Sequence, residues 1–426
     1  MKVKISPSSL TKRVIEIPPS KSMAHRAIVC ASLATGRSVI TNIDYSVDIQ
    51  TTLDGMKKLG AKIQQFDDYV IVDGVEDLTQ INDTNIECNE SGSTLRFFIP
   101  IFSLTNKEIT FSGTKRLMER PQDIYEKIFN DQGLVFKQED GKIIINGSLR
   151  KKRYQLKGNV SSQFISGLLF TLPLLNGDSI IEIEPPFESR SYVDLTLQMM
   201  KNFGVSAYFV NDTTIHIIGN QKYVAKDTRV EGDFSQLGFY AVLGALQGPL
   251  DCIGLNTKSL QGDKQIVSIL RDMGCNVEVL DEGYRFNQSK LQGCTIDLNN
   301  CPDLGPILST CASYASGETN IVNAGRLRIK ESDRIAAMES ELLKCGVDFK
   351  STKDSITIKG PSHFICDKEL QGHNDHRIVM ALAIAATCAK QPLIIDDAQS
   401  IRKSYPGFFE DLASLGIDVE KINDES

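Results

Sequence analysis

Polar and basic side chains gather where the chain changes from a strand pattern to a helix pattern. The most specific of these groups runs from Pro18 to Ser22, and Arg26 follows it one helical turn later. Lys21 offers a compact positive charge, Ser22 a hydroxyl, and Arg26 a planar fork that can bind two oxygens. This combination predicts a site for a phosphate or a carboxylate.

Further groups of this kind occur at later turns. Gly92 would let a ligand approach the backbone where a Cβ atom would intrude, and Ser161-Ser162-Gln163 offers neutral donors for hydroxyls or a phosphate. Basic residues stand at or just beyond these turns, namely Lys21, Arg26, Arg120, Lys330, Arg334, Arg377 and Lys403. Because cations oppose the dipole of a helix N-terminus, bound anions explain them better than helix stability does.

Two carboxylates are candidates for acid–base chemistry. Asp303 and Glu331 would each lie among cations and still be able to exchange protons. The simpler interpretation of Glu331 is a solvated ion pair with Arg334, three residues later. Residues at the other turns, such as Ser91 and Asp375, could likewise be ordinary N-caps. The excess of basic residues at the same turns favours the functional interpretation.

The absence of other motifs narrows the chemistry. The sequence has no GxxxxGK[ST] phosphate loop and no GxGxxG fingerprint, and its ten cysteines form no CxxC motif. His373 and His376, three residues apart, could bind a metal, but no third ligand is evident. We therefore expect no metal and no organic cofactor. The expected ligands are two or more anionic small molecules, with proton transfer as the catalysis.

Composition and charge restrict the class of protein. Hydrophobic residues make up 41% and charged residues 24%, which is normal for a soluble globular chain and excludes collagen, a coiled coil and wholesale disorder. The net charge of −7 argues against nucleic acid or an acidic membrane as a general partner. The N-terminus has no apolar signal core, and the longest apolar stretch, residues 378–389, is too short to span a bilayer. We expect a cytoplasmic monomer.

These residues lie at the turns of a sequence unit that occurs six times along the chain. In each copy an apolar helix end leads into a glycine and then a short strand, and the copies are roughly 71 residues apart. The glycines are Gly60, Gly133, Gly204, Gly274, Gly346 and Gly416. A hairpin pattern usually follows the glycine, such as the one that turns at Asp140-Gly141.

The order of elements within a unit is that of an α/β block. In the first unit, strands are expected near residues 15–17 and 39–41, and helices near residues 22–33 and 47–59. The whole unit reads strand–helix–strand–helix–strand–strand. The sixth unit ends after one strand, and the opening strand at residues 2–6 is left over, so we expect these two strands to pair.

Six blocks predict two domains of three blocks each. The N-terminal domain would comprise residues 19–230, and the C-terminal domain residues 1–18 together with residues 231–426. The chain would cross between the domains twice, near Pro18-Pro19 and near residues 229–232. Such a double connection suits closure of the domains on a ligand.

The motifs at these turns resemble those of a known family. They occur in the family's order over nearly the whole chain, as PPSKSMAHR (18–26), ESGSTLR (90–96), ERP (119–121), VSSQF (160–164), SRSY (189–192), PD (302–303), RIKESDR (328–334), NDHR (374–377) and RKSYP (402–406). The chain resembles the 5-enolpyruvylshikimate-3-phosphate synthases, the enolpyruvyl transferases of the shikimate pathway. The resemblance implies an α/β fold of two domains, each an inside-out α/β barrel of three βαβαββ units in a pseudo-threefold arrangement.

The resemblance also implies a reaction and its ligands. The 5-hydroxyl of shikimate 3-phosphate would add to C2 of phosphoenolpyruvate while C3 is protonated, and the tetrahedral intermediate would then lose phosphate. Shikimate 3-phosphate would contact Lys21, Ser22, Arg26, Ser161, Ser162, Gln163, Ser189, Asp303 and Lys330. Phosphoenolpyruvate would contact Lys21, Gly92, Arg120, Gln163, Arg334, Arg377 and Lys403, and its inhibitor mimic glyphosate would depend on Gly92. Asp303 would be the base for the hydroxyl, and Glu331 would exchange the proton at C3, with Lys21 as the competing candidate.

Some positions depart from the family, and two other functions stay open. Glu90 stands where the family commonly has Asn, Arg326 where some members have a substrate-binding Asn, and Ser93 where Thr is common. A UDP-N-acetylglucosamine enolpyruvyl transferase would have Lys-Asn at Lys21-Ser22 and a reactive Cys in the loop at residues 112–121, which has none. A non-catalytic two-domain anion-binding protein would keep the arginines without needing the two carboxylates.

Overall fold

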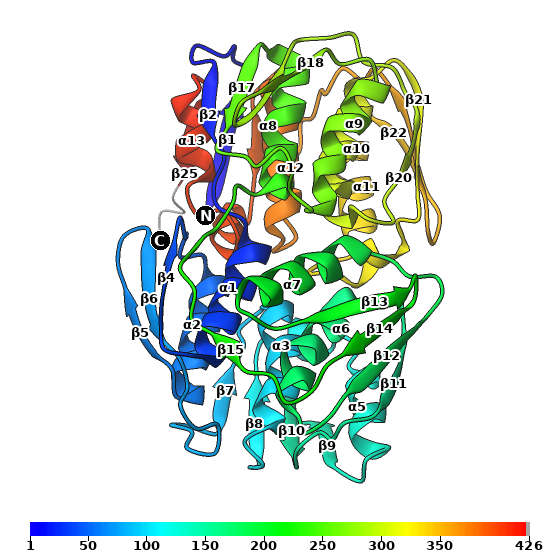
Figure 1. The fold of residues 1–426 in the computed structure, drawn as a ribbon. Coiled ribbons are helices and arrows are strands. Elements are labelled where there is room, and N and C mark those ends of the chain that lie inside the picture. Colours follow the sequence, from blue (N-terminus) through cyan, green and yellow to red (C-terminus); the bar gives the residue numbers. More distant parts are fainter. Residues whose placement is uncertain (423–426) are drawn as a thin grey trace. The chain divides into compact units, whose positions relative to one another are not determined.

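Helices and short strands alternate through residues 1–422, which are the residues that the computed structural model describes (Figure 1). The chain forms two compact units, and each has an apolar core of its own. One unit comprises Pro19–Val230, and the other comprises Met1–Pro18 together with the chain from Glu231 onward.

Three sheets of four strands surround the core of the unit Pro19–Val230. Their strands are β4 (Arg37–Thr41), β5 (Lys62–Gln65), β6 (Tyr69–Asp73), β7 (Asn85–Glu87), β8 (Ile109–Ser112), β9 (Val135–Glu139), β10 (Lys142–Asn146), β11 (Arg153–Lys157), β12 (Ser179–Glu184), β13 (Ala207–Asn211), β14 (Thr214–Ile217) and β16 (Thr228–Arg229). The strand orders are β16-β4-β6-β5, β7-β8-β10-β9 and β11-β12-β14-β13. In every sheet the first pair is parallel and the following pairs are antiparallel. A short parallel pair, β3 (Ala34–Thr35) with β15 (Tyr223–Val224), completes the unit.

The helices of this unit divide into buried and half-buried ones. They are α1 (Lys21–Leu33), α2 (Val47–Leu59), α3 (Gly92–Ser103), α4 (Lys115–Met118), α5 (Asp123–Asn130), α6 (Ser162–Thr171), the 3-10 turn η1 (Leu172–Leu174) and α7 (Arg190–Asn202). Nearly every residue of α1, α3 and α6 is buried. The sequences of α3 and α6 are mostly apolar, whereas α1 also buries the polar side chains of His25 and Arg26. The amphipathic helices α2 and α7 bury one face only.

The second unit repeats this plan. Its strands are β1 (Lys2–Ser6), β2 (Val14–Glu16), β17 (Leu250–Ile253), β18 (Val277–Leu280), β19 (Gly283–Phe286), β20 (Thr295–Asp297), β21 (Gly317–Val322), β22 (Asp348–Ser351), β23 (Ile356–Gly360), β24 (Leu393–Ile395) and β25 (Asp418–Ile422). The sheet orders are β18-β19-β17-β2, β20-β21-β23-β22 and β24-β1-β25.

The helices of the second unit also follow the plan of the first. They are α8 (Phe234–Gln247), η2 (Gly262–Lys264), α9 (Gln265–Asp272), η3 (Pro302–Leu304), α10 (Gly305–Tyr314), η4 (Gly325–Ile329), α11 (Arg334–Lys344), α12 (His376–Thr387), η5 (Ala398–Lys403) and α13 (Phe408–Ser414). Helices α8, α10 and α12 are buried almost throughout. The predicted α/β fold of repeated blocks is therefore confirmed.

The recurring glycines have a common backbone conformation. All six have a positive φ, between 67° at Gly133 and 120° at Gly60, where other residues would be strained. Each follows a helix and is followed within three residues by a strand. The six copies inferred from the sequence are thus copies of one structural turn.

The strand that opens the first block by sequence lies within residues 1–18, which the sequence argument assigns to the C-terminal domain. β2, expected near residues 15–17 as part of that block, pairs in parallel with β17 and so belongs to the second unit. Its place beside β4 is taken by β16, at the end of the third block. The chain leaves the second unit directly after β2, so a strand that opens a block by sequence completes a sheet of the other unit.

The N-terminal strand completes the last sheet. β1 lies between β24 and β25 and is antiparallel to both, with Val3 opposite Ile395 on one side and Lys421 on the other. Val3 and Ile5 are fully buried. The expected pairing of the first strand with the last one is confirmed.

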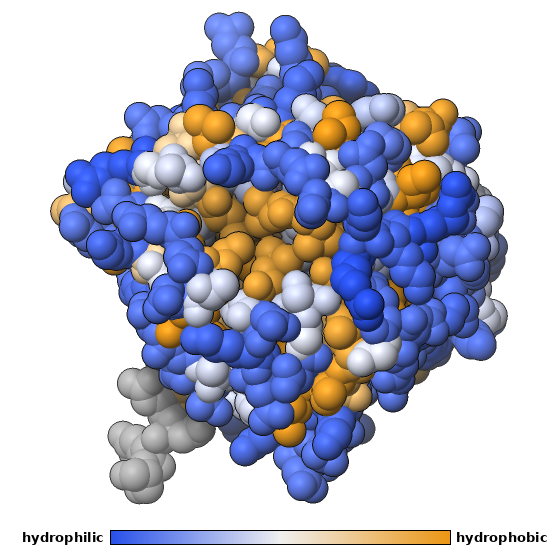
Figure 2. All heavy atoms as spheres, turned by 60° about the horizontal axis from the view of Figure 1, so that its bottom comes forward, coloured by the Kyte–Doolittle hydropathy of each residue, from blue (hydrophilic) through white to orange (hydrophobic). Residues whose placement is uncertain are grey.

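The face of the molecule drawn in Figure 2 is mostly hydrophilic. Figure 2 shows one face of the molecule with polar residues around its rim and apolar side chains gathered in a central hollow. In the described part of the chain, no helix combines the length and apolar character needed to cross a membrane.

Candidate active site

The helix starts in the unit Pro19–Val230 carry the predicted serines. Ser20, Ser91 and Ser161 are the N-caps of α1, α3 and α6, and each side chain accepts a hydrogen bond from a backbone N–H of the first turn. The simple interpretation as caps therefore holds for these serines. Ser189 differs, because it precedes α7 in the left-handed conformation, with φ at 53°, and is not a side-chain cap.

Lys21 and Arg26 lie on the first turns of α1 but in different surroundings. Lys21 Nζ donates to Asp48 Oδ2 at 2.7 Å, at the start of α2. Arg26 is buried and donates to Thr196 Oγ1 at 2.8 Å and to the carbonyl of Tyr192 at 3.0 Å. Burial lowers the pKa of Arg26 to about 10. Arg26 therefore ties α1 to α7, while Lys21 is the more accessible cation.

A second group joins the starts of α3 and α6. Gln163 Oε1 accepts from Arg96 Nη1 at 2.8 Å, and Gln163 Nε2 donates to Ser93 Oγ at 2.9 Å. A Cβ atom added to Gly92 would lie only 2.6 Å from Arg120 Nη1. The predicted residues Gly92, Arg120 and Gln163 are thus brought together. Arg96 belongs with them and was missed as a site residue, although it ends the ESGSTLR motif.

A buried chain of hydroxyls connects three helices of the same unit. His25 Nδ1 lies 2.7 Å from Thr52 Oγ1, which lies 2.7 Å from Thr94 Oγ1, and Thr94 Oγ1 lies 2.6 Å from Ser91 Oγ. Burial, aided by Lys21 and Arg26, holds the pKa of His25 well below its usual value. A neutral histidine therefore helps to fix the α3 turn at Gly92 against α1.

In the second unit, Asp303 lies at the centre of a cluster of cations. Its Oδ1 accepts from Lys330 Nζ at 3.1 Å and Arg334 Nη1 at 3.0 Å, and its Oδ2 from Arg377 Nη2 at 3.4 Å. Burial opposes the ionisation of Asp303, but the charges of Arg377, Lys330 and Arg334 outweigh it and hold its pKa well below the usual value. The carboxylate is therefore ionised at neutral pH.

Arg334 is the most enclosed member of this cluster. Its side chain is 1% exposed, and besides Asp303 it donates to Asp375 Oδ2 at 2.8 Å and Glu331 Oε2 at 2.7 Å. Burial alone would lower its pKa, but the three carboxylates raise it. The cations that the sequence places at helix starts are thus balanced in part by carboxylates of the protein. The pair of Arg334 with Glu331 is the one that the simpler interpretation of the sequence expected, whereas its bonds to Asp303 and Asp375 were not expected.

The start of α12 is tied to the same cluster. Asp375 caps the helix through the N–H of Arg377 at 3.0 Å and also accepts from Ser332 Oγ at 2.9 Å. Lys403 Nζ donates to the carbonyl of Asn374 at 2.5 Å. The predicted residues Lys330, Glu331, Arg334, Arg377 and Lys403 therefore share one site with Asp303.

Asp263 is a further acidic residue beside this cluster. Its side chain is buried, its Oδ2 accepts from Ser235 Oγ, and its Oδ1 has no partner among the described residues. Burial, reinforced by the charge of Asp303, raises its pKa to about 7. The sequence places Asp263 at a helix start but gives no sign of this environment.

The histidine pair does not form a metal site. His373 Nε2 lies 2.8 Å from Glu341 Oε1, and His376 is buried at the start of α12. Among residues 1–422, no group of three or more His, Cys, Asp or Glu side chains is placed to hold a metal ion.

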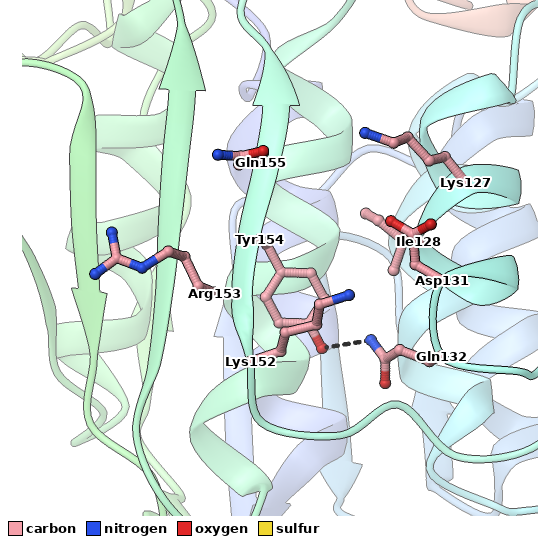
Figure 3. A pocket seen from close by; sticks show the side chains of 8 residues that line it. All are labelled: Lys127, Ile128, Asp131, Gln132, Lys152, Arg153, Tyr154 and Gln155. Atoms are coloured by element: carbon pink, nitrogen blue, oxygen red, sulfur yellow. Dashed lines mark hydrogen bonds between the residues drawn. The ribbon is translucent and has the colours of Figure 1, made fainter.

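A separate hollow of about 100 Å³ lies between α5 and the edge strand β11. Figure 3 shows Lys127, Asp131 and Gln132 on the helix side, and Tyr154 opposite them, with its hydroxyl 3.2 Å from Gln132 Nε2. None of its lining residues is a predicted site residue. We assign no role to this hollow.

Two solved structures have the same fold as this chain. An EPSP synthase from Acinetobacter baumannii superposes with a TM-score of 0.81 at 24% identity, covering 99% of this chain and 100% of that one. The enolpyruvyl transferase NikO from Streptomyces tendae gives a TM-score of 0.81 at 15% identity, covering 98% of both chains. The fold is that of the enolpyruvyl transferases.

Sequence comparison identifies the family within that class. The family model for EPSP synthase (3-phosphoshikimate 1-carboxyvinyltransferase) matches residues 5–412. A 3-phosphoshikimate 1-carboxyvinyltransferase from Clostridium kluyveri is 46% identical over 426 residues, covering 98% of each chain. One from Clostridium perfringens is 47% identical over 418 residues, covering 97% of this chain and 98% of the relative. The chain belongs to the EPSP synthase family and is a transferase.

Proposed function

We propose that the protein transfers the enolpyruvyl group of phosphoenolpyruvate to the 5-hydroxyl of shikimate 3-phosphate and releases phosphate, in the pathway to chorismate and the aromatic amino acids. The observation that carries this proposal is the ionised carboxylate of Asp303 among Lys330, Arg334 and Arg377. The cations can bind the phosphates and carboxylates of the ligands, and the ionised carboxylate among them can accept the proton of a hydroxyl. The family membership of the chain supports the same reaction.

The proposed ligand contacts follow the predicted residues. Shikimate 3-phosphate is assigned to Lys21, Ser22, Arg26, Ser161, Ser162, Gln163, Ser189, Asp303 and Lys330. Phosphoenolpyruvate is assigned to Lys21, Gly92, Arg120, Gln163, Arg334, Arg377 and Lys403. Arg26 and Arg334 are buried and bonded within the protein, so we propose that they act chiefly by fixing their neighbours and by their charge.

The chemistry is an addition followed by an elimination. In the addition, Asp303 takes the proton of the 5-hydroxyl, the oxygen bonds to C2 of phosphoenolpyruvate, and C3 gains a proton from Glu331 or Lys21. In the elimination, C3 returns a proton and the bond between C2 and the phosphate oxygen breaks. Positive charge developing at C2 would be balanced by the nearby carboxylates, and the leaving phosphate by the cations.

The cations also explain how Asp303 becomes a base. In the free protein they hold its pKa well below the usual value. When ligand phosphates and carboxylates engage Lys330 and Arg377, the attraction on the Asp303 carboxylate weakens and its pKa rises. Ligand binding would thus prepare the base for the reaction.

Release of inorganic phosphate tests the function. Purified protein mixed with saturating phosphoenolpyruvate and shikimate 3-phosphate should release phosphate, and each substrate alone should not. Release with UDP-N-acetylglucosamine in place of shikimate 3-phosphate would identify the alternative transferase. Binding of both ligands without release would identify a non-catalytic anion-binding protein.

We also propose that the protein acts in the cytoplasm as a monomer, without a metal, an organic cofactor, nucleic acid or a membrane. The net charge of −7 disfavours binding of an acidic polymer such as nucleic acid. Light scattering of the eluting peak in size-exclusion chromatography should give the mass of one chain, 47.1 kDa. A mass of two chains would contradict the monomer.

A further inference from the structure

A buried carboxylate lies behind the start of α12. Glu341, on α11, is 1% exposed. It accepts hydrogen bonds from Lys344 Nζ at 2.6 Å, His373 Nε2 at 2.8 Å and the backbone N–H of Gln371 at 2.9 Å. These donors and the charge of Lys344 outweigh burial and lower the pKa of Glu341 to about 2. A buried, charged group with three donors is a strong local anchor.

The segment that Glu341 holds is a turn of unusual conformation. His373 and Asn374 are consecutive residues with φ of 52° and 51°, in the left-handed region that costs free energy for residues other than glycine. Such a turn persists only when its surroundings fix it. Glu341 fixes its beginning through Gln371 and His373.

The same turn carries groups of the candidate site. The carbonyl of Asn374 accepts from Lys403 Nζ, and Asp375 caps α12 through the N–H of Arg377. The turn therefore sets the position of the Asn374 carbonyl that Lys403 contacts and the point where the helix bearing Arg377 begins. Asp375 is held from the other side by Arg334.

We propose that Glu341 is a positioning residue which, through His373 and Gln371, holds the turn at residues 371–375 so that Arg377 and Lys403 are placed to bind phosphoenolpyruvate. This inference rests on the proposed function, because it takes Arg377 and Lys403 as the ligands of that substrate. Glu341 itself touches no reacting group. Its effect is expected in substrate binding, more than in turnover.

The variant E341Q tests the proposal. It keeps the shape of the side chain and an acceptor for Gln371 but loses the charge that holds His373 and Lys344. We expect KM for phosphoenolpyruvate to rise roughly tenfold, the scale of one lost charged hydrogen bond, while KM for shikimate 3-phosphate and kcat stay within about threefold. The matched control is E339Q on the same helix, where Glu339 accepts from Ser351 Oγ on β22 and, among the described residues, has no hydrogen bond with the turn. Unchanged KM values in E341Q, or an equal rise in both, would overturn the proposal.

A pair of changes at His373 separates positioning from general stability. His373 is partly exposed, so its variants should fold, which thermal unfolding would verify. H373Q keeps an N–H donor for Glu341, whereas H373F keeps a ring without one. The phosphoenolpyruvate KM should rise in H373F and be largely rescued in H373Q. Equal values in the two variants would contradict a role of the bond to Glu341.

The variant R377K distinguishes failure of this inference from failure of the proposed site. If R377K raises KM for phosphoenolpyruvate and E341Q does not, the site assignment stands and the positioning role of Glu341 is wrong. If R377K leaves that KM unchanged, Arg377 is not a ligand of phosphoenolpyruvate, and the positioning role is overturned with it.

Discussion

At the scale of single residues, Asp303 is subject to two opposing influences. Burial favours its neutral form, and Arg377, Lys330 and Arg334 favour the ionised form and prevail. We predict that D303A retains binding of shikimate 3-phosphate but loses at least ~10²-fold in kcat, the usual scale for an acid–base group. Steady-state kinetics and calorimetric titration would measure both quantities. An equal loss of binding and turnover would make Asp303 mainly a binding residue.

Gly92 lies next to the guanidinium of Arg120. A Cβ atom at this position would lie 2.6 Å from Arg120 Nη1, too close for both groups to keep their places. The variant G92A should therefore displace Arg120 and raise KM for phosphoenolpyruvate, and the inhibition constant of the mimic glyphosate more strongly. The KM for shikimate 3-phosphate serves as an internal control. Unchanged kinetics would show that Gly92 does not line the site.

Asp263 makes the stability of the free protein depend on pH. Its folded-state pKa of about 7 lies above the usual 3.8, so the folded protein binds the proton more tightly and loses stability as pH rises between these values. D263N can still accept from Ser235 and never ionises. We expect urea unfolding at pH 8 to show D263N more stable than the unaltered protein by about 2–4 kcal/mol, with a smaller difference at pH 5. A difference independent of pH would contradict the raised pKa.

The candidate site was only partly predictable because residue types do not reveal partners. The sequence identified Lys330, Glu331 and Arg334 from their clustering at a helix start, and the structure places them beside Asp303. It gave no sign of Glu341, which sits within α11 like any charged helix residue. The contacts of Glu341 with a turn some 30 residues further along arise from tertiary packing, which no local pattern encodes.

At the scale of elements, β1 is a short strand in the middle of its sheet. It is paired on both sides, and Ile5 is fully buried between β24 and β25. The variant I5A should lower the free energy of unfolding by about 2–4 kcal/mol, as for other buried isoleucines. The neighbouring K4A, whose side chain is 39% exposed, is the control and should change stability little. Equal effects of the two variants in urea unfolding would contradict the burial of β1.

The strands show where a repeat in the sequence is informative and where it fails. The pairing of β1 with β25 could be predicted, because the sixth block lacks a strand and residues 2–6 supply one. The sequence assigned residues 1–18, and so β2, to the C-terminal domain, but the repeat did not identify β17 as its partner. Its partner is decided by where the chain passes from one unit to the other, at Pro18.

At the scale of the whole molecule, one unit is formed by a single segment of the chain and the other by two separate segments. Pro19–Val230 is one continuous segment with three complete sheets and its own core, so we expect this fragment to fold alone and to unfold cooperatively in urea. A fragment that starts at Glu231 lacks β1 and β2, which leaves edges of β17, β24 and β25 unpaired and part of the core missing. It should not fold cooperatively until a peptide of residues 1–18 is added. Circular dichroism of both fragments, with and without the peptide, would measure this, and cooperative folding of the second fragment without the peptide would contradict the account.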